Sequence, residues 1–150
     1  MTFREVTENK KQYMTMLLDA DPQENMIDRY LDRGRMFVLD DDGVKAECVV
    51  TEESPEILEI KNLAVEDSAK GKGYGRRMIE YIADTFRSRY PILQVGTGDS
   101  PATVPFYEKC GFVRSHTEKD FFTDNYDPPI IDAGVLLTDM VFFRMPLQDR

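Results

Sequence analysis

The chain has 150 residues, 41% of them apolar, which is enough for one ordinary hydrophobic core but not comfortably for two. We therefore expect a single domain over residues 1–150. The formal net charge of -9 argues against a nucleic-acid partner, because an acidic surface displaces few counterions from a phosphate backbone. The charge suits a basic substrate, although a need for solubility explains it equally well.

Several function classes lack the residues or segments that they need. No apolar run approaches the roughly 20 residues that cross a bilayer, and the N-terminus has no run of signal-peptide length, so a cytoplasmic protein without a membrane partner is expected. Cys48 and Cys110 show no CxxC spacing, which predicts neither a disulfide framework nor a zinc site. His116 is the sole histidine, so neither a metal centre nor a Ser-His-Asp triad is predicted.

The first half of the chain mixes short strands with two helices. Apolar side chains recur at helical spacing in two segments, the second opened by Asp21-Pro22, and Asp42-Gly43 is a strong hairpin turn signal. Within the strand that ends at Val65, strict alternation puts Glu59 and Leu63 on one side and Asn62 on the other. The predicted helices cover 8–20 and 21–34, and the predicted strands cover 2–7, 36–39, 44–51 and 56–65.

The second half begins with a change of period. Met78, Ile79, Ile82, Ala83 and Phe86 form the stripe of a helix that lies on a sheet. The predicted elements are a helix over 76–89, a strand over 92–97, a short helix opened by Ser100-Pro101 and ending at Cys110, and strands over 112–122 and 136–147. Hairpin strands followed by a strand-helix-strand unit indicate a mixed α/β sheet rather than a doubly wound parallel one.

The loop Lys70-Gly71-Lys72-Gly73-Tyr74-Gly75 has the properties of an anion-binding site. Its glycines let backbone N–H groups turn into one concavity, and the helix that follows adds its positive end. Lys70, Lys72, Arg76 and Arg77 reverse the local sign of an acidic chain. The alternative is a flexible turn with a cationic helix start, but cations there oppose the helix dipole, so structure alone gives no reason for them.

The spacing of the glycines excludes two common nucleotide motifs. A Walker A loop ends in Gly-Lys-Ser/Thr, whereas Gly75 is followed by two arginines. A dinucleotide fingerprint needs its third glycine three positions after the second, and counting from Gly71 and Gly73 that position is Arg76. Such a fingerprint would also open the first strand-helix unit, not follow several hairpin strands.

The sequence resembles the GNAT superfamily of acetyl-CoA-dependent N-acetyltransferases. The matching segments are Glu59–Val65, Lys70–Gly75 and Phe106–Phe112, so the resemblance is carried between about Ile57 and Phe112. Further segments are similar to a bacterial subgroup of small GNAT enzymes resembling YvbK: Leu17–Pro22, Val95–Gly98, Asp120–Phe122 and Asp139-Met140. The resemblance implies a mixed, mostly antiparallel sheet of about six to seven strands, flanked by about four helices and splayed at the acetyl-CoA site.

The resemblance also implies two catalytic residues. Glu59 occupies the place where many GNAT enzymes carry a general base, and Tyr107 the place of the hydroxyl that protonates the departing CoA sulfur. A base is needed because an alkylamine with a pKa of about 10.4 is almost entirely protonated at neutral pH. The alternatives are a solvent-facing strand residue for Glu59 and a core aromatic for Tyr107.

Acetyl-CoA is the implied cosubstrate, and a primary amine, in particular a small cation, is the expected acceptor. The residues expected at the cofactor are Leu63, Ala64 and Val65, through their backbone, together with Lys70, Gly71, Lys72, Gly73, Tyr74, Gly75, Arg76 and Ser100. Residues 121–132 mix aromatic and acidic side chains that suit a cationic amine, or else form an ordinary acidic connection. The alternative function is a non-catalytic acyl-CoA sensor. For the oligomeric state, a homodimer that forms through an exposed edge strand near the C-terminus stays open.

Overall fold

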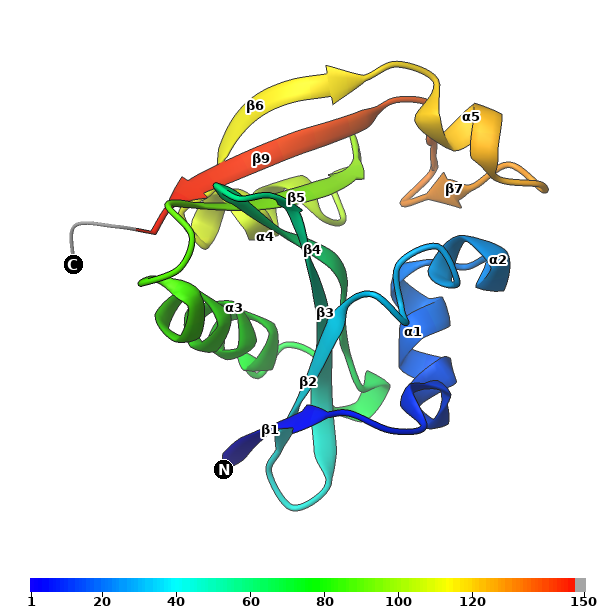
Figure 1. The fold of residues 1–150 in the computed structure, drawn as a ribbon. Helices are drawn as coiled ribbons and strands as arrows, with labels where there is room; N and C mark the ends of the chain where they lie inside the picture. The colour runs from blue at the N-terminus through cyan, green and yellow to red at the C-terminus, as the bar shows by residue number, and fades with distance from the viewer. Residues whose placement is uncertain (148–150) are drawn as a thin grey trace.

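The structure, a computed structural model, describes residues 1–147 and is organised around one seven-stranded sheet (Figure 1). The strand order is β1-β2-β3-β4-β5-β9-β6, and every neighbouring pair is antiparallel except β4 and β5. The mixed sheet predicted from the sequence is confirmed. Its strands are β1 (Thr2–Val6), β2 (Arg35–Asp40), β3 (Val44–Ser54), β4 (Ile57–Val65), β5 (Ile92–Gly98), β6 (Val113–Glu118) and β9 (Met140–Pro146), and β7 (Ile131–Asp132) pairs separately with β8 (Val135–Leu136).

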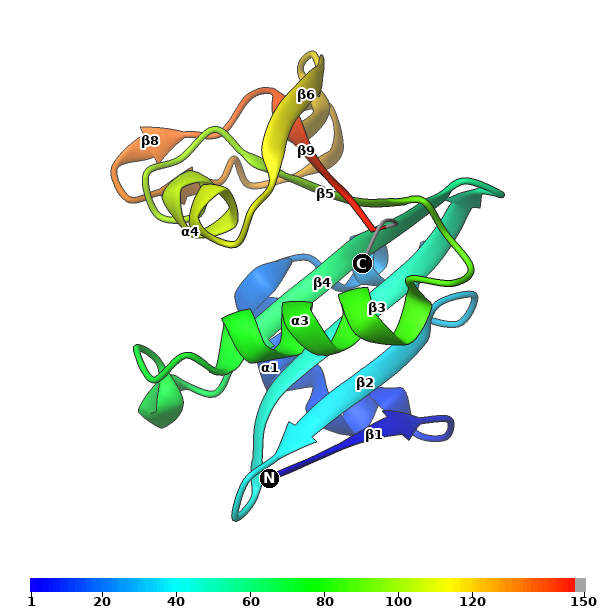
Figure 2. The same cartoon turned by 90° about the vertical axis from the view of Figure 1, so that its left-hand side faces the viewer.

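Helices cover both faces of the first four strands. In Figures 1 and 2, α3 lies on one face and α1 and α2 lie on the other. The five apolar side chains of the predicted stripe on α3 are all buried, as expected. The described residues contain five α-helices rather than about four, namely α1 (Met14–Ala20), α2 (Glu24–Ile27), α3 (Tyr74–Phe86), α4 (Val104–Lys109) and α5 (Phe121–Asn125), with 3₁₀ turns η1 (Lys10–Tyr13) and η2 (Asp67–Ala69).

A β-bulge in β4 changes which side chains share a face. Two consecutive residues of β3 stand opposite Ile60 and Asn62, so Lys61 is an extra residue between the two pairs. Ile60 and Leu63 both pack toward the core beneath α3, whereas the Asn62 side chain donates to the carbonyl oxygen of Leu17 in α1. The alternation predicted from the sequence is therefore wrong beyond Lys61, because a bulge shifts the period by one residue.

Four predicted elements differ in extent. The segment 8–20 divides into η1 and α1, and the helix predicted over 21–34 is only four residues long, although its apolar residues Met26, Ile27, Tyr30 and Leu31 are buried. The strand predicted over 112–122 ends at Glu118, and the strand predicted over 136–147 is interrupted between β8 and β9. The prediction of a strand at 121–122 is wrong, because the backbone turns at a left-handed residue before α5.

One edge of the sheet is an exposed strand. β6, in the C-terminal part of the chain, forms one edge of the seven-stranded sheet, beside β9. All six of its residues are exposed. It matches the edge strand expected from the sequence, whose role in dimerisation stays a prediction. No helix in residues 1–147 has the length and apolar character needed to span a membrane.

Candidate active site

The sheet opens at its centre into a V-shaped splay. β4 and β5 pair only from Ile57 to Ile60 against Ile92 to Val95, after which β5 follows β9 and β4 stays with β3. A cleft of about 1010 Å³ occupies this opening. Leu63, Ala64 and Val65 line it and pair with β3 on their other side, so the β4 edge that faces β5 has no ladder partner there. The structure places the predicted backbone contacts at an open sheet edge.

The glycine loop forms one end of the cleft. Gly71 and Gly73 have φ of +80° and +87°, and an added Cβ would meet no atom within 4 Å, so backbone conformation rather than space requires glycine. Gly73 is the N-cap of α3, whose first turn contains no acidic residue. Among the described residues, no backbone N–H of positions 71–76 donates to a protein acceptor. Six free donors at a helix N-terminus fit a pyrophosphate.

The charged and aromatic side chains of the loop differ in whether they line the cleft. Lys70 and Arg76 line the cleft, and Lys70 Nζ lies 3.1 Å from Asp19 Oδ2. The Tyr74 hydroxyl donates to Asp41 Oδ2 at 2.7 Å, which ties the start of α3 to the β2–β3 turn. Lys72 is exposed and is not among the residues that line the cleft, so its predicted contact with the cofactor stays a prediction.

Gly75 and α4 bring Tyr107 to the splay. A Cβ on Gly75 would lie 3.1 Å from the Phe106 ring, so the glycine permits close approach of α3 and α4. The Tyr107 ring packs edge-on against Phe106 and Phe112, and the residue lines the cleft with 8% of its surface exposed. Burial raises the pKa of its hydroxyl. Tyr107 is therefore both a core aromatic and a protonated donor at the cleft.

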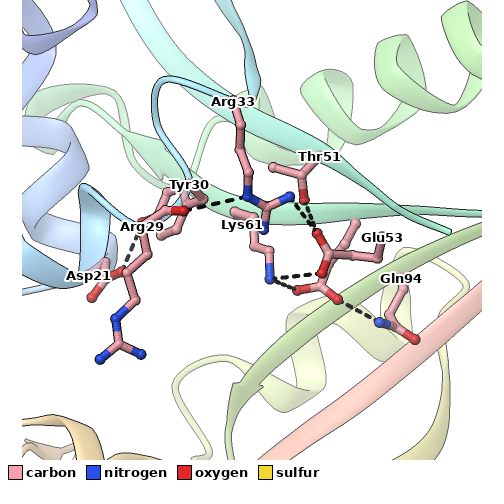
Figure 3. Close-up of polar contacts among 9 residues, drawn as sticks. Asp21, Arg29, Tyr30, Arg33, Thr51, Glu53, Lys61 and Gln94 are labelled. Atoms are coloured by element: carbon pink, nitrogen blue, oxygen red, sulfur yellow. Dashed lines mark hydrogen bonds and ion pairs between the residues drawn. The ribbon is translucent and has the colours of Figure 1, made fainter.

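Glu59 is buried and does not line the cleft, whereas its neighbours Lys61 and Gln94 are labelled in Figure 3. Its Oε2 lies 2.6 Å from Lys61 Nζ, and its Oε1 accepts a hydrogen bond of 2.5 Å from Gln94. Lys61 does line the cleft, and its Nζ also lies 3.7 Å from Glu53. The solvent-facing alternative for Glu59 is wrong, since only 5% of the residue is exposed. Lys61 therefore links the buried carboxylate of Glu59 to the cleft.

Asp21 is the centre of a second polar group at the cleft, and its role was not predicted from the sequence. Asp21 Oδ2 accepts from the Tyr30 hydroxyl at 2.8 Å, and Oδ1 accepts from the Tyr126 hydroxyl at 2.6 Å. The Tyr30 oxygen in turn accepts from Asn62 Nδ2 at 3.0 Å; the Asp21–Tyr30 part of this chain is visible in Figure 3. Burial raises the pKa of Asp21, and the bonds from Tyr126 and Tyr30 oppose part of that change. Asp21 was missed because the pair Asp21-Pro22 was interpreted as the start of a helix, which gave the aspartate a structural role.

Ser100, Cys110 and His116 are not assigned a part in the chemistry. Ser100 is 2% exposed and does not line the cleft; its Oγ accepts from the Ala102 N–H, so its predicted cofactor contact stays a prediction. The short helix begins at Val104, later than predicted. Cys110 lines the cleft, but burial raises the pKa of its thiol, which disfavours a nucleophilic thiolate. His116 is exposed and stacks on a phenylalanine of β9.

Comparison with known proteins identifies the family. Residues 32–114, more than half of the chain, match the acetyltransferase (GNAT) domain family. The chain belongs to the GNAT acetyltransferase family. It is 31% identical to the uncharacterized N-acetyltransferase YvbK of Bacillus subtilis over 143 residues, which cover 93% of this chain and 92% of YvbK. The resemblance predicted from the motifs is confirmed, and the protein is an acyltransferase.

Solved GNAT structures agree over nearly the whole chain. A GNAT acetyltransferase from Elizabethkingia anophelis with acetyl-CoA bound has a TM-score of 0.91 at 30% identity, covering 97% of each chain. An IAA acetyltransferase from Bacillus cereus has a TM-score of 0.89 at 32% identity, and a Bacillus subtilis acetyltransferase in complex with CoA has 0.87 at 30%; each covers 97% of this chain and 98% of its own. The splayed sheet of this GNAT enzyme is therefore a family architecture.

Proposed function

We propose that this GNAT enzyme transfers an acetyl group from acetyl-CoA to a primary amine by direct attack of the amine in a ternary complex. The structure of its relative from Elizabethkingia anophelis contains bound acetyl-CoA, and that of its relative from Bacillus subtilis is a complex with CoA. Acetyl-CoA supplies an activated acetyl thioester. The single observation that carries the proposal is one cleft that combines six free backbone N–H groups, an open β4 edge and the Tyr107 hydroxyl.

The cofactor end of the cleft suits the diphosphate and the pantetheine arm. Residues 71–76 present their amides at the start of α3, and Lys70 and Arg76 add positive charge beside them. The free edge at residues 63–65 offers backbone groups to the amide-containing arm. We assign the expected cofactor contacts to these residues, with Lys72 and Ser100 at the periphery.

Tyr107 and Glu59 are proposed to handle the two protons. Tyr107 stays protonated at neutral pH because burial raises its pKa, so it donates to the departing sulfur. Glu59 accepts the proton of the amine indirectly, through a water beside Lys61, because the buried carboxylate does not line the cleft whereas its ion-pair partner Lys61 does. Gln94 donates a hydrogen bond to the other carboxylate oxygen of Glu59 and so fixes the orientation of this buried group.

Turnover assays test the proposal. A thiol-release screen of acetyl-CoA against an amine library is expected to show CoA release only when an acceptor is present. Glu59→Gln and Tyr107→Phe should each lower kcat by about tenfold or more. Glu53→Gln is the matched control for Glu59→Gln, because it removes the other, longer ion pair of Lys61. Full turnover in both Glu59→Gln and Tyr107→Phe would refute the two assignments, and tight CoA binding without turnover would favour a sensor.

The expected cellular setting stays part of the proposal. We expect a cytoplasmic location, which is tested by fractionation of cells that produce the protein. A homodimer through β6, all of whose residues are exposed, is tested by light scattering of the wild type. Neither is required for the chemistry proposed for the cleft.

A further inference from the structure

One wall of the cleft is apolar. The wall comes from α5, the loop that follows it and the segment entering β9, and its side chains are Phe122, Tyr126, Ile130, Leu137 and Met140. Phe122, Tyr126 and Leu137 are each at most 9% exposed and belong to one hydrophobic cluster with Met26, against which Ile130 and Met140 pack. Such a wall favours the binding of an apolar group, and it has no charged side chain that could pair with a ligand carrying several charges.

Asp21 is the buried carboxylate at this wall. It is 8% exposed, and Tyr126, a wall residue, holds one of its oxygens while Tyr30 holds the other. Burial raises the pKa of both hydroxyls, so they remain donors and Asp21 remains the acceptor. Each carboxylate oxygen keeps a further lone pair for an N–H donor. Asp21 is therefore a fixed, preorganised partner for one positive charge.

The other carboxylates that line the cleft are placed differently. Asp19 is exposed and pairs with Lys70 at 3.1 Å. Asp132 is half-buried on the short strand β7, beside Ile131, which is 71% exposed, so it lies at the rim. A second cation held deep against the wall would have no buried carboxylate to pair with, and an unpaired buried ammonium is strongly unfavourable.

We propose that the acceptor is a monocationic primary amine with an apolar body, whose ammonium binds Asp21 while its body lies on the wall. This inference rests on the proposed function and narrows its substrate class. Asp21 acts in binding, and proton removal remains with Glu59. Tyr30 and Tyr126 are positioning residues, because they act through the carboxylate that they hold.

A matched set of amines tests the wall with the wild-type enzyme. Hexylamine should have a kcat/KM about tenfold above that of butylamine, because each buried methylene contributes about threefold to fourfold in binding. 1,6-Diaminohexane has the same length with a second cation and should fall at least about tenfold below hexylamine. Equal values for hexylamine and butylamine, or a diamine as good as hexylamine, would overturn the inference even though acetyl transfer occurs.

Variants test the anchor. Asp21→Asn keeps the shape but removes the charge, and should raise the KM for hexylamine by about tenfold or more with kcat and the KM for acetyl-CoA nearly unchanged. Calorimetry should show the same loss of hexylamine affinity for the CoA-loaded protein. Asp124→Asn, an exposed site on α5, is the matched control and should leave both constants unchanged.

The outcomes separate this inference from the proposed function. An unchanged hexylamine KM in Asp21→Asn would remove the anchor, and a lost kcat with an unchanged KM would make Asp21 a proton acceptor instead; either overturns the assignment. If Asp21→Asn does not fold, the amine series on the wild type still decides the substrate class. If no amine elicits CoA release, the proposed function itself fails and the inference fails with it.

Discussion

Glu47 is expected to make the stability of the enzyme fall as the pH rises. It lies on β3 opposite Ala64, it is fully buried, and neither carboxyl oxygen has a hydrogen-bond partner within the described residues. Burial raises the pKa of this carboxyl from 4.5 to about 8, and the nearby Ala64 amide opposes only part of the change. The folded state therefore holds a proton that the unfolded state releases above about pH 4.5.

The size of the effect follows from linkage. Stability is full below the unfolded pKa and is lost as the pH rises toward the folded pKa, because only the unfolded chain gains from ionisation in that interval. At about 1.4 kcal/mol per pH unit, the loss is about 3 kcal/mol at pH 7 and approaches about 5 kcal/mol above pH 8. Glu47→Gln cannot ionise, so it should lack this loss.

Urea unfolding of the wild type and Glu47→Gln at pH 4, 5.5, 7 and 8.5 measures the difference directly. We expect the advantage of the variant over the wild type to grow by several kcal/mol between pH 4 and pH 8.5. Glu56→Gln makes the same chemical change at an exposed site and controls for it. A constant difference between wild type and Glu47→Gln across this range would refute the reasoning.

Three further predictions concern the cofactor end of the cleft. Gly73→Ala should raise the KM for acetyl-CoA and lower stability by about 1 kcal/mol, whereas Gly43→Ala, which also has positive φ but lies in the β2–β3 turn, should lower stability alone, as kinetics and melting will show. Arg76→Ala should raise the KM for acetyl-CoA several-fold and Arg77→Ala should not, because only Arg76 lines the cleft; an equal effect would contradict this placement. For Tyr107→Phe, the roughly tenfold or greater loss of kcat should be independent of pH between 6 and 9, since the high pKa of the hydroxyl keeps it protonated there; a loss confined to one end of this range would contradict its role as donor.

Features encoded by local patterns could be predicted from the sequence. The stripe on α3 follows from helical periodicity, and the positive φ angles at Gly71 and Gly73 follow from the glycines of the loop. The two nucleotide motifs were excluded by spacing alone. These features depend on residues within one turn or one loop of each other, which a single sequence displays.

Features that depend on tertiary contacts could not be predicted. The bulge at Lys61 is set by pairing with β3, and it reverses the faces of Asn62 and Leu63. The bond between Tyr126 and Asp21 joins residues 105 positions apart. Phe121 and Phe122 were predicted as the end of a strand because aromatic side chains favour strands, whereas packing on Met26 stabilises a short helix instead.

Steady-state kinetics with both substrates varied tests the central claim most directly. With acetyl-CoA and the best amine of the screen, direct attack in a ternary complex predicts intersecting double-reciprocal lines, one CoA released per acetylated amine, and no acetylated protein by mass spectrometry. Parallel lines together with an acetyl group on Cys110 would contradict the account, as would CoA release that does not depend on the amine.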